Sequence, residues 1–463
     1  MSNKILLALG FAAASTLAQA QGVTPQLEAR ASEIASAALQ DTLGYQLVES
    51  LTTEVGPRLA GTEAEERARQ WAVEQLRDLG FSNVAIEPFE LPVWERGIER
   101  AEITSPFPQP LVVTALGGSV ATGPEGVEAG VVSVDSVAAL RKASSERLAG
   151  KIVYVDEVMT RTQDGAGYGV AVSKRREAAY IAEEKGASAV LIRSVGTSGH
   201  RFAHTGQMRR LTDEDGARGV PAAALSAPDA DQLKRILAAG KELKLRLVLT
   251  PQQRPAGVSG NVVAEIRGTE APEEIVLVGA HLDSWDLGTG AVDDGAGVGI
   301  VVAAAKRVME AMPEGPRRTV RVVLFGAEEV GLVGAQAYAQ AHADELANHV
   351  VASESDFGAG RIWRFNTGVA EDKVSQAQAL GVVVRSLGAS PGHNFASGGP
   401  DMKYVREAGV PVVGLKQNGW DYFDLHHTPN DTLDKVDPED IAHNVAAWAS
   451  FIYLAANTAE SYR

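Results

Sequence analysis

The sequence predicts an α/β protein in which a mostly parallel or mixed sheet is flanked by helices and a small β-rich module is inserted. From Asn261 onward, short apolar runs alternate with helix-length segments, a pattern typical of parallel sheets whose crossovers are helices. Between residues 111 and 254, short apolar runs instead follow one another with glycine and proline between them. With 463 residues, 45% of them hydrophobic, the chain is long enough for two or three domains.

The first segment, residues 23 to about 108, is expected to be mainly helical. Thr62 and Glu65 have the spacing of a capping box, which starts a helix whose apolar residues recur at helical intervals until Gly80. The turn-rich stretch 56–61 just before this helix has no role that the sequence assigns. We expect residues 21–110 and 255–463 to form the main domain, interrupted by an inserted domain over 111–254.

The inserted module is expected to consist of short strands with one or two helices. Its main helix is expected over 175–185, because Gly186 would stop it there. Strands are expected over 151–155, 189–192, 220–225 and 243–249. The module holds few of the residue combinations that carry chemistry.

The last part of the chain should supply the main sheet and its covering helices. Strands are expected over 275–280, 320–325 and 411–415, and helices over 295–312, 331–342 and 438–459. The last of these helices is apolar and should pack on the sheet.

Residues 1–20 have the pattern of a secretory signal. Lys4 precedes a short apolar stretch, and Ala18-Gln19-Ala20 is an A-x-A cleavage site. The protein is therefore expected to be exported, to the periplasm or the extracellular medium, after cleavage near Ala20. A membrane anchor is the alternative, which the small-residue cleavage site disfavours. No other segment has the run of about 20 apolar residues that a membrane span needs.

The composition excludes several classes of function. The chain has no cysteine, so disulfides, thiolate metal sites and cysteine nucleophiles are excluded. Its formal net charge is -16 at pH 7, and such a surface is a poor partner for nucleic acid, because phosphate binding needs clustered cations.

Residue types that bind metals gather after the expected strands. Acidic residues and a histidine follow the apolar runs 275–280 and 320–325 and the apolar pair 350–351, and two histidines lie near the C-terminus. In open α/β sheets the ligand site lies beyond the carboxyl ends of the strands. The candidate site residues are His281, Asp283, Asp293, Glu328, Glu329, Asp356, His426 and His427.

These residue types favour zinc, with cobalt or manganese as alternative occupants. His281 and Asp283 are two residues apart, so they lie on the same side of an extended backbone, and the carboxylate could hold the ring nitrogen that does not bind metal. Glu328 and Glu329 are adjacent and project in different directions. One could bind a metal while the other reaches the attacking water, although two solvated acids opening a helix would look the same.

The motifs together resemble the M28 family of co-catalytic zinc peptidases and, within it, the carboxypeptidase Q branch. The resemblance covers nearly the whole mature chain and implies the zinc exopeptidase fold, with a protease-associated domain as the inserted module. It rests on the segments His281-Leu282-Asp283-Ser284-Trp285-Asp286, Gly290-Ala291-Val292-Asp293-Asp294-Gly295, Ala327-Glu328-Glu329, Glu354-Ser355-Asp356 and His426-His427-Thr428-Pro429-Asn430-Asp431-Thr432.

The resemblance also implies roles. Two zinc ions would be held by His281, Glu329, Asp356 and His427, with Asp293 bridging them. Glu328 falls at the general-base position, Asp283 at that of the carboxylate that orients the first histidine, and the Asp293–Asp294 peptide at one that is often cis.

Some positions stay open at this stage. The family ligand directly precedes Thr or Ser, which favours His427 over His426 as the ligand. Related members have a tyrosine where this chain has His426, so His426 or the nearby Tyr422 is the candidate transition-state donor. His204 in the inserted module could reach the cleft or be structural, and Asp401 resembles an acidic residue near the cleft.

The predicted function is therefore that of a secreted dizinc exopeptidase acting on dipeptides or short peptides with a free terminus, with Glu328 as general base. The resemblance also suggests a homodimer. The choice among aminopeptidase, carboxypeptidase and dipeptidase stays open. The alternatives are a catalytically inactive peptidase-like binding protein and a single-zinc glutaminyl cyclase.

Overall fold

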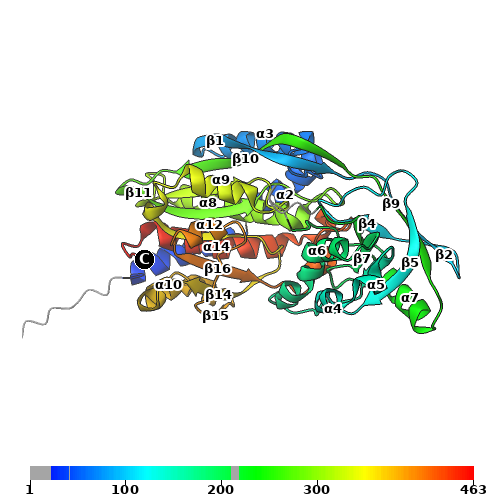
Figure 1. Cartoon of the computed structure of the whole chain (residues 1–463). Helices are drawn as coiled ribbons and strands as arrows, with labels where there is room; N and C mark the ends of the chain where they lie inside the picture. The colour runs from blue at the N-terminus through cyan, green and yellow to red at the C-terminus, as the bar shows by residue number, and fades with distance from the viewer. Residues whose placement is uncertain (1–21, 41, 210–217) are drawn as a thin grey trace, which may run out of the picture.

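The computed structural model describes residues 22–40, 42–209 and 218–463, which form two eight-stranded sheets with helices around them (Figure 1). The predicted α/β class is confirmed. The proposed signal sequence, residues 1–20, lies outside the described residues. Within the part that is described, no helix is long and apolar enough to cross a membrane.

Four adjacent parallel strands form the centre of the main sheet, whose order is β1-β10-β12-β11-β13-β16-β14-β15. They are β12 (Arg318–Phe325), β11 (Ala271–His281), β13 (His349–Glu354) and β16 (Val412–Gln417). Antiparallel β14 (Ile362–Gly368) adjoins β16, and the short β15 (Ser390–Pro391) lies beyond it. Because Gly279 of β11 pairs with both Val323 and Glu354, the carboxyl ends of these strands meet at one edge.

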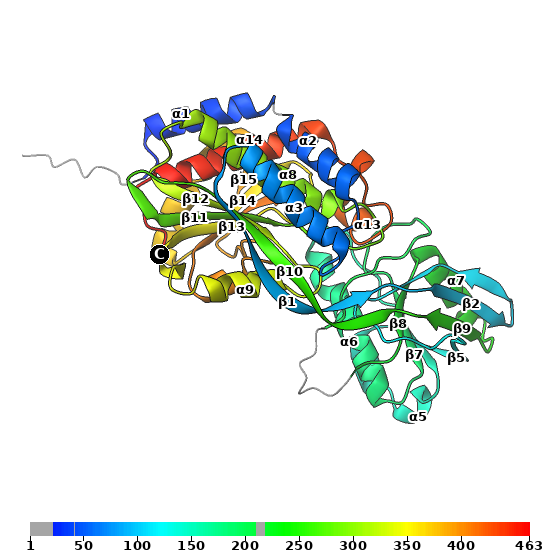
Figure 2. The same cartoon turned by 90° about the horizontal axis from the view of Figure 1, so that it is seen from above.

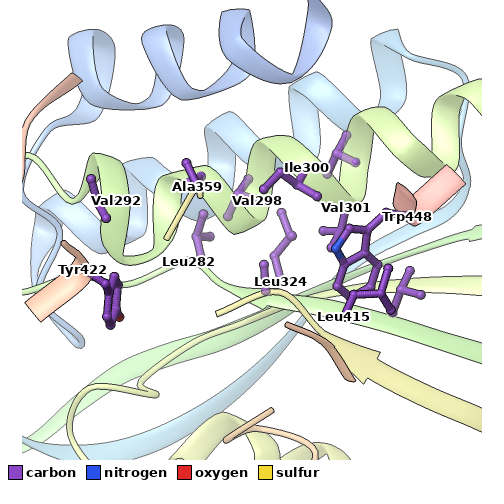
Figure 3. Packing of buried hydrophobic residues seen from close by; sticks show 14 of the residues in the cluster. Leu282, Val292, Val298, Ile300, Val301, Leu324, Ala359, Leu415, Tyr422 and Trp448 are labelled. Atoms are coloured by element: carbon purple, nitrogen blue, oxygen red, sulfur yellow. The ribbon is translucent and has the colours of Figure 1, made fainter. Parts of the chain in front are cut away.

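Helices cover both faces of this sheet. On one face α8 (Ala296–Ala311) and α14 (Pro438–Asn457) lie beneath α1 (Pro25–Ala38) and α2 (Leu43–Ser50), and on the other lies α9 (Val333–Ala341) (Figure 2). The short helix α12 (Lys403–Glu407) shares the core of α9 on this second face. Successive side chains of a central strand therefore pack into the cores on opposite faces of the sheet. In β11, for example, Val276 belongs to one core and Leu277 to the other. In the first core, Trp448 of α14 and Leu324 of β12 lie below the apolar face of α8 (Figure 3).

The first segment is less helical than its sequence predicts. The helix α3 (Glu63–Asp78) begins as expected, with the Thr62 side chain accepting from the backbone N–H of Glu65. It is followed by a long strand, β1 (Ser82–Glu95), which pairs antiparallel with β10 (Gln252–Ile266). β1 is an edge strand with two prolines and mostly exposed or half-buried side chains, so no apolar run marks it.

β1 and β10 run together from the main sheet toward the second sheet (Figure 2). The parallel strands of that sheet are β5 (Val127–Val134), β6 (Ile152–Val155), β7 (Ala189–Arg193) and β8 (Ala222–Leu225). The other strands are β2 (Glu99–Ser105), β3 (Gln109–Leu111), β4 (Val113–Ala115) and β9 (Lys244–Leu249). The second sheet takes in residues 99–249 rather than beginning after 111, because β2 pairs with β9.

Helix α6 (Ala166–Glu184) packs on one face of the second sheet with α4 (Val137–Lys142), and α7 (Ala227–Ala238) packs on the other. α6 begins well before the predicted residue 175, since its first turn contains glycines that conceal it in the sequence. The other helical segments are short: α5 (Ser145–Leu148), α10 (Val374–Ala379), α11 (Val382–Ser386), α13 (Tyr422–Leu425), the π-helical turns η1 (Leu51–Val55) and η2 (Ala291–Gly295), and the 3₁₀ turns η3 (Leu346–Asn348), η4 (Glu371–Lys373) and η5 (Leu433–Lys435).

Candidate metal centre

The candidate ligands lie at the carboxyl edge of the main sheet. His281 is the last residue of β11, Glu329 follows β12, and Asp356 follows β13. Asp293 lies in the π-helical turn η2, and His427 follows α13. Buried Leu282 and Val292, next to His281 and Asp293 in the chain, belong to the core of Figure 3 and fix these two segments against it.

The carboxylate of Asp293 is the centre of the cluster. Its Oδ1 lies 3.0 Å from Nε2 of His281, and its Oδ2 lies 3.3 Å from Nε2 of His427. Each histidine also faces a second carboxylate: Nε2 of His281 is 3.6 Å from Oδ1 of Asp356, and Nε2 of His427 is 2.9 Å from Oε2 of Glu329. The five side chains therefore form two histidine–carboxylate pairs joined by one aspartate.

The donor set fits divalent metal ions. Three groups of His, Asp and Glu side chains place their ligand atoms within 4.8 Å of one another: Asp293, His426, His427; His281, Asp293, Glu329; and His281, Asp294, Asp356. Oε1 of Glu329 is buried and has no hydrogen-bond partner among the described residues, as expected of an oxygen meant for a metal. Imidazole and carboxylate donors without thiolate suit zinc best.

His427 is held in place from the second sheet. Its backbone has the left-handed conformation, with φ +61°, which is rare for a residue other than glycine. Its Nδ1 lies 3.2 Å from the carbonyl oxygen of Thr205, and the Thr205 N–H donates to the His427 carbonyl at 3.0 Å. Burial lowers the pKa of His427, but Glu329 and Asp293 outweigh it and raise this pKa to about 9. These contacts leave Nε2 as the nitrogen that faces the carboxylates.

His426 stacks on His427, with ring centroids 3.5 Å apart. Its Nε2 lies 3.7 Å from Oδ2 of Asp293, farther than that of His427, and its buried Nδ1 has no partner in the described structure. The ring centroids of Tyr422 and His426 lie 5.2 Å apart, and Tyr422 lines the same pocket. Both candidate transition-state donors therefore lie beside the cluster.

Asp283 is positioned differently from the prediction. The group within hydrogen-bond distance of Nδ1 of His281 is the backbone carbonyl of Asp283, at 2.9 Å, whereas the carboxylate Oδ1 is 3.8 Å away. The carboxylate instead accepts from the backbone N–H groups of Glu328, at 3.0 Å, and Glu329, at 3.3 Å. Burial raises the pKa of Asp283 to about 7. Asp283 thus aligns both the histidine and the glutamate pair.

Glu328 projects into the pocket from a strained turn. Ala327, directly before it, has φ +58°, in the left-handed region that side chains rarely adopt. The Glu328 carboxylate accepts no hydrogen bond from the described residues. Burial and the nearby carboxylates of Asp356 and Glu329 raise its pKa well above the ordinary range for glutamate. Its backbone is fixed by Asp283, which accepts its N–H, and by the N–H groups of Gly331 and Leu332, which donate to its carbonyl, while the carboxylate stays free to act on a ligand.

Three residues that support the site were not found from the sequence. Asp431 accepts from the N–H of Val292 at 2.6 Å, and Asp294 accepts from the N–H of His281 at 3.1 Å. The buried Arg58, from the turn-rich stretch before α3, donates to loop carbonyls near the site. Asp294 and Asp431 lie inside motifs noted in the sequence, but nothing distinguishes Arg58 there. The Asp293–Asp294 peptide is cis, as the resemblance implied.

The structure also places the two residues whose roles the sequence left undecided, His204 and Asp401. His204 is buried, with Nδ1 2.8 Å from the carbonyl oxygen of His426, and burial lowers its pKa to about 4. It therefore supports the His426–His427 segment as a neutral ring. Asp401 is buried beside Glu354, whose Oε2 accepts from the Asp401 N–H at 2.8 Å.

The cluster opens into a pocket of about 810 Å³, within the size range of small-molecule sites. Its lining comes from the parts of the chain around both sheets. Tyr168 and Arg175 belong to α6, which packs on the second sheet, whereas Asp356, Phe395 and Tyr404 belong to the main domain. The second sheet thus supplies one wall of the pocket that contains the candidate ligands.

Known proteins resemble this chain in sequence. The model of "Peptidase family M28" matches residues 261–452. Carboxypeptidase Q of Rattus norvegicus is 36% identical over 420 residues, which cover 90% of this chain and 86% of the relative. Aminopeptidase YwaD of Bacillus subtilis (strain 168) is 26% identical over 333 residues, or 70% of this chain and 64% of that protein.

A solved structure also matches. The crystal structure of a peptidase M28 precursor from Shewanella amazonensis SB2B has a TM-score of 0.92 and 49% sequence identity, and the alignment covers 95% of this chain and 98% of that chain. Fold, sequence and motifs therefore agree, and the chain belongs to peptidase family M28, a family of metallo-exopeptidases.

Proposed function

We propose that this chain is an exported exopeptidase that holds two zinc ions and hydrolyses dipeptides or short peptides with a free terminus. One observation carries the proposal: the two oxygens of Asp293 face two separate histidines, 3.0 Å and 3.3 Å away. One carboxylate placed in this way can bridge two ions. A site for a single ion would not need a second histidine–carboxylate pair.

His281 and Asp356 would hold one ion, His427 and Glu329 the other, and Asp293 would bind both. When bound, the ions would polarise the scissile carbonyl and lower the pKa of water. The chain has no cysteine, so every side-chain donor available to these ions is an imidazole or a carboxylate.

Glu328 would act as the general base. It takes a proton from the attacking water and returns it to the nitrogen of the leaving amine, while the new C–O bond replaces the C–N bond. Asp283 keeps this glutamate in position by accepting the N–H of Glu328 at 3.0 Å. His426 or Tyr422 would donate a hydrogen bond to the oxyanion, since both lie beside the cluster.

The Glu328→Gln variant tests this assignment. Glutamine keeps the shape of the side chain but cannot accept the proton, so kcat on a dipeptide should fall by roughly 10² to 10⁴. Metal content and melting temperature should stay at the wild-type values. Glu314→Gln, the same change at an exposed loop residue, serves as the control. Wild-type turnover by the Glu328 variant would rule out the base.

Metal analysis separates the proposal from its alternatives. Two zinc ions per chain, measured by mass spectrometry after dialysis, are expected of the dizinc peptidase. One ion per chain, with cyclisation of N-terminal glutamine peptides, would favour a glutaminyl cyclase. No bound metal, with peptide binding but no hydrolysis, would favour a binding protein.

Export rests on the sequence pattern of residues 1–20. Expression of the full chain in a bacterium, followed by fractionation, should give a mature protein that begins near Gln21 outside the cytoplasm. A protein that retains Met1 and stays with the cytoplasmic fraction would contradict export without affecting the catalytic proposal.

A further inference from the structure

The short helix α13 connects three site residues, because Tyr422 begins it and His426 and His427 follow it directly. It spans only Tyr422–Leu425, and the side chain of its N-cap residue, Asp421, makes no capping hydrogen bond with the described residues. An isolated helical turn of this length is unstable in water. Contacts with the rest of the chain must therefore fix where α13 lies.

Asp424 of α13 accepts hydrogen bonds from the part of the chain that contains the second sheet. Nη2 of Arg161 lies 2.6 Å from its Oδ1 and 2.8 Å from its Oδ2, and the hydroxyl of Thr197 donates to Oδ1 at 2.8 Å. Nη2 of Arg161 also donates to the Thr197 carbonyl at 3.2 Å. Arg161, Thr197 and Asp424 therefore form a closed set of contacts, which we call the α13 clamp.

Backbone contacts extend this clamp. The N–H of Thr197 donates to the carbonyl of Phe423 at 3.0 Å. Nη1 of Arg161 donates to the carbonyl of Trp420 at 2.6 Å and to Oδ1 of Asp421 at 3.1 Å. The clamp thus holds α13 by a side chain, by its backbone and by the residues just before it.

Arg161 and Thr197 lie in two loops that leave the second sheet at one edge. β6 and β7 are neighbouring parallel strands, with Val155 paired to Ile192 near their carboxyl ends. Arg161 lies between β6 and α6, and Thr197 follows β7. Because the carboxyl ends of neighbouring parallel strands meet at the same edge, both loops can contact α13 together.

Little chain separates the clamp from the candidate ligand His427. The N–H of His426 donates to the Tyr422 carbonyl at 3.0 Å, and the N–H of Thr428 donates to the Leu425 carbonyl at 3.1 Å. These two bonds continue the turn of α13 through His427. A displacement of α13 therefore displaces the ring of His427 as well.

The other candidate metal position is fixed within the main domain. His281 ends β11, its Nδ1 lies 2.9 Å from the Asp283 carbonyl, and its N–H donates to Asp294 at 3.1 Å. Asp356 follows β13, the neighbour of β11 in the sheet. The clamp therefore acts on the metal position of His427 rather than on that of His281.

Stability alone does not account for the clamp. The side chain of Arg161 is 30% exposed and that of Asp424 is 25% exposed. Ion pairs with this much contact with water contribute little to the free energy of folding, because solvent screens them. Their hydrogen bonds still fix distances and directions, since charged donors and acceptors form the shorter and stronger bonds.

We propose that Asp424 is a positioning residue for the metal ligand His427, and that Arg161 and Thr197 act through it. Loss of the clamp then weakens one of the two proposed ions, the one at His427, and leaves the ion at His281 in place. This inference rests on the proposed dizinc function and adds residues that act on only one of its metal positions.

Two other contacts hold the same segment and give the rival explanation. Nδ1 of His204 lies 2.8 Å from the His426 carbonyl, and Thr205 exchanges contacts with His427 at 3.0 Å and 3.2 Å. Both act on the residues after α13, whereas the clamp acts on the helix itself. If they alone positioned His427, removal of the Asp424 carboxylate would change nothing at the metal.

The test removes this carboxylate and measures zinc binding by competition with a chelator. In Asp424→Ala one of the two ions should bind about 10- to 100-fold more weakly than in the wild type, and the other should change by less than about threefold. The metal-free variant should melt within about 2 °C of the wild type, because an exposed ion pair adds little stability. Asp424→Asn keeps one acceptor oxygen and should recover part of the affinity.

Two variants approach the clamp from the other side. Arg161→Met and Thr197→Val should weaken the same ion, Thr197→Val by less because its backbone N–H remains. They decide the question in the same titration if Asp424→Ala does not fold. Arg246→Met breaks an ion pair that lies within the second sheet, with Glu128, and is the control that should bind both ions as the wild type does.

A background without His427 identifies which ion is affected. His427→Ala should keep one zinc ion, and adding Asp424→Ala should change its affinity by less than about threefold, since the residue that Asp424 positions is already gone. A further loss of this ion would overturn the proposal. An equal loss of both ions in Asp424→Ala alone would do the same, because it would show a general structural role.

The remaining outcomes separate this inference from the proposed function. A wild type that binds two zinc ions, with unchanged affinities in Asp424→Ala, Arg161→Met and Thr197→Val, overturns the inference and leaves the dizinc function standing. A wild type that binds one ion or none shows that the dizinc function fails, and the inference falls with it.

Discussion

Arg58 is expected to be one of the most sensitive positions outside the ligands. Its guanidinium is fully buried and donates to the carbonyl oxygens of Leu282 at 2.5 Å, Thr289 at 2.7 Å and Gly290 at 2.9 Å. These carbonyls belong to the loop between His281 and Asp293. Arg58 therefore fixes the loop that carries two of the candidate ligands.

The size of the effect follows from these contacts. In Arg58→Met an apolar chain of similar length fills the space, but the buried carbonyls of Leu282 and Gly290 and the partly buried carbonyl of Thr289 lose this donor, and each such loss costs about 1–3 kcal/mol at a buried site. Relief from burying the charge offsets part of this cost, because burial lowers the pKa of Arg58 while Asp431 and Asp283 raise it. We expect a net loss of about 4 kcal/mol, a large fraction of the roughly 5–15 kcal/mol of a typical domain.

Urea unfolding of the zinc-loaded protein, followed by circular dichroism, measures this loss. Zinc affinity, measured by competition with a chelator, should fall by about 10- to 100-fold, as is typical when a group that supports a metal ligand is removed. Arg58→Lys keeps the charge but not the forked guanidinium, so it should recover part of the free energy of unfolding and part of the zinc affinity. Arg235→Met at an exposed site is the control. A loss below about 1 kcal/mol with unchanged zinc affinity would refute the reasoning.

Other changes give equally direct tests. Asp293→Asn should leave less than one zinc per chain, because both ions lose an anionic ligand; retention of two ions by mass spectrometry would contradict the bridge. His426→Ala or Tyr422→Phe, whichever removes the oxyanion donor, should lower kcat by about 10²- to 10³-fold with little change in KM, and wild-type kcat in both would exclude both. Burial lowers the pKa of His349 to about 4, so the folded state resists its protonation. The stability that this neutral ring contributes is present above pH 6.5 and lost as the pH falls toward 4, by about 3 kcal/mol in total; His349→Gln should flatten that part of the unfolding profile, and an unchanged slope would refute the assignment.

The sequence predicted those parts of the site that hydrophobic pattern and strand ends encode. The strands β11 and β12 are buried on both faces, so they appear as apolar runs, and His281 and Glu329 follow them at the edge where ligands bind. β1 was missed, because an exposed edge strand has no apolar run. Arg58 was missed because most of its partners are backbone carbonyls more than two hundred residues away, which leave no pattern in the sequence.

The prediction for Asp283 shows a different limit. Spacing placed its carboxylate on the same side of the strand as His281, yet the peptide carbonyl of the same residue reaches Nδ1 at 2.9 Å. Both groups can accept the N–H, and residue type does not decide between them. The choice depends on where the chain turns after β11, and there the carboxylate finds two N–H donors, on Glu328 and Glu329.

The same reasoning explains why the second sheet matters for catalysis although its sequence carries few reactive combinations. At His427 its contribution includes the carbonyl of Thr205, the missing side chain of Gly206 and the cation of Arg175. The left-handed backbone of His427 is unfavourable for an isolated loop, and the paired hydrogen bonds with Thr205 offset this cost. The part of the chain that contains the second sheet therefore helps to hold this candidate ligand in position.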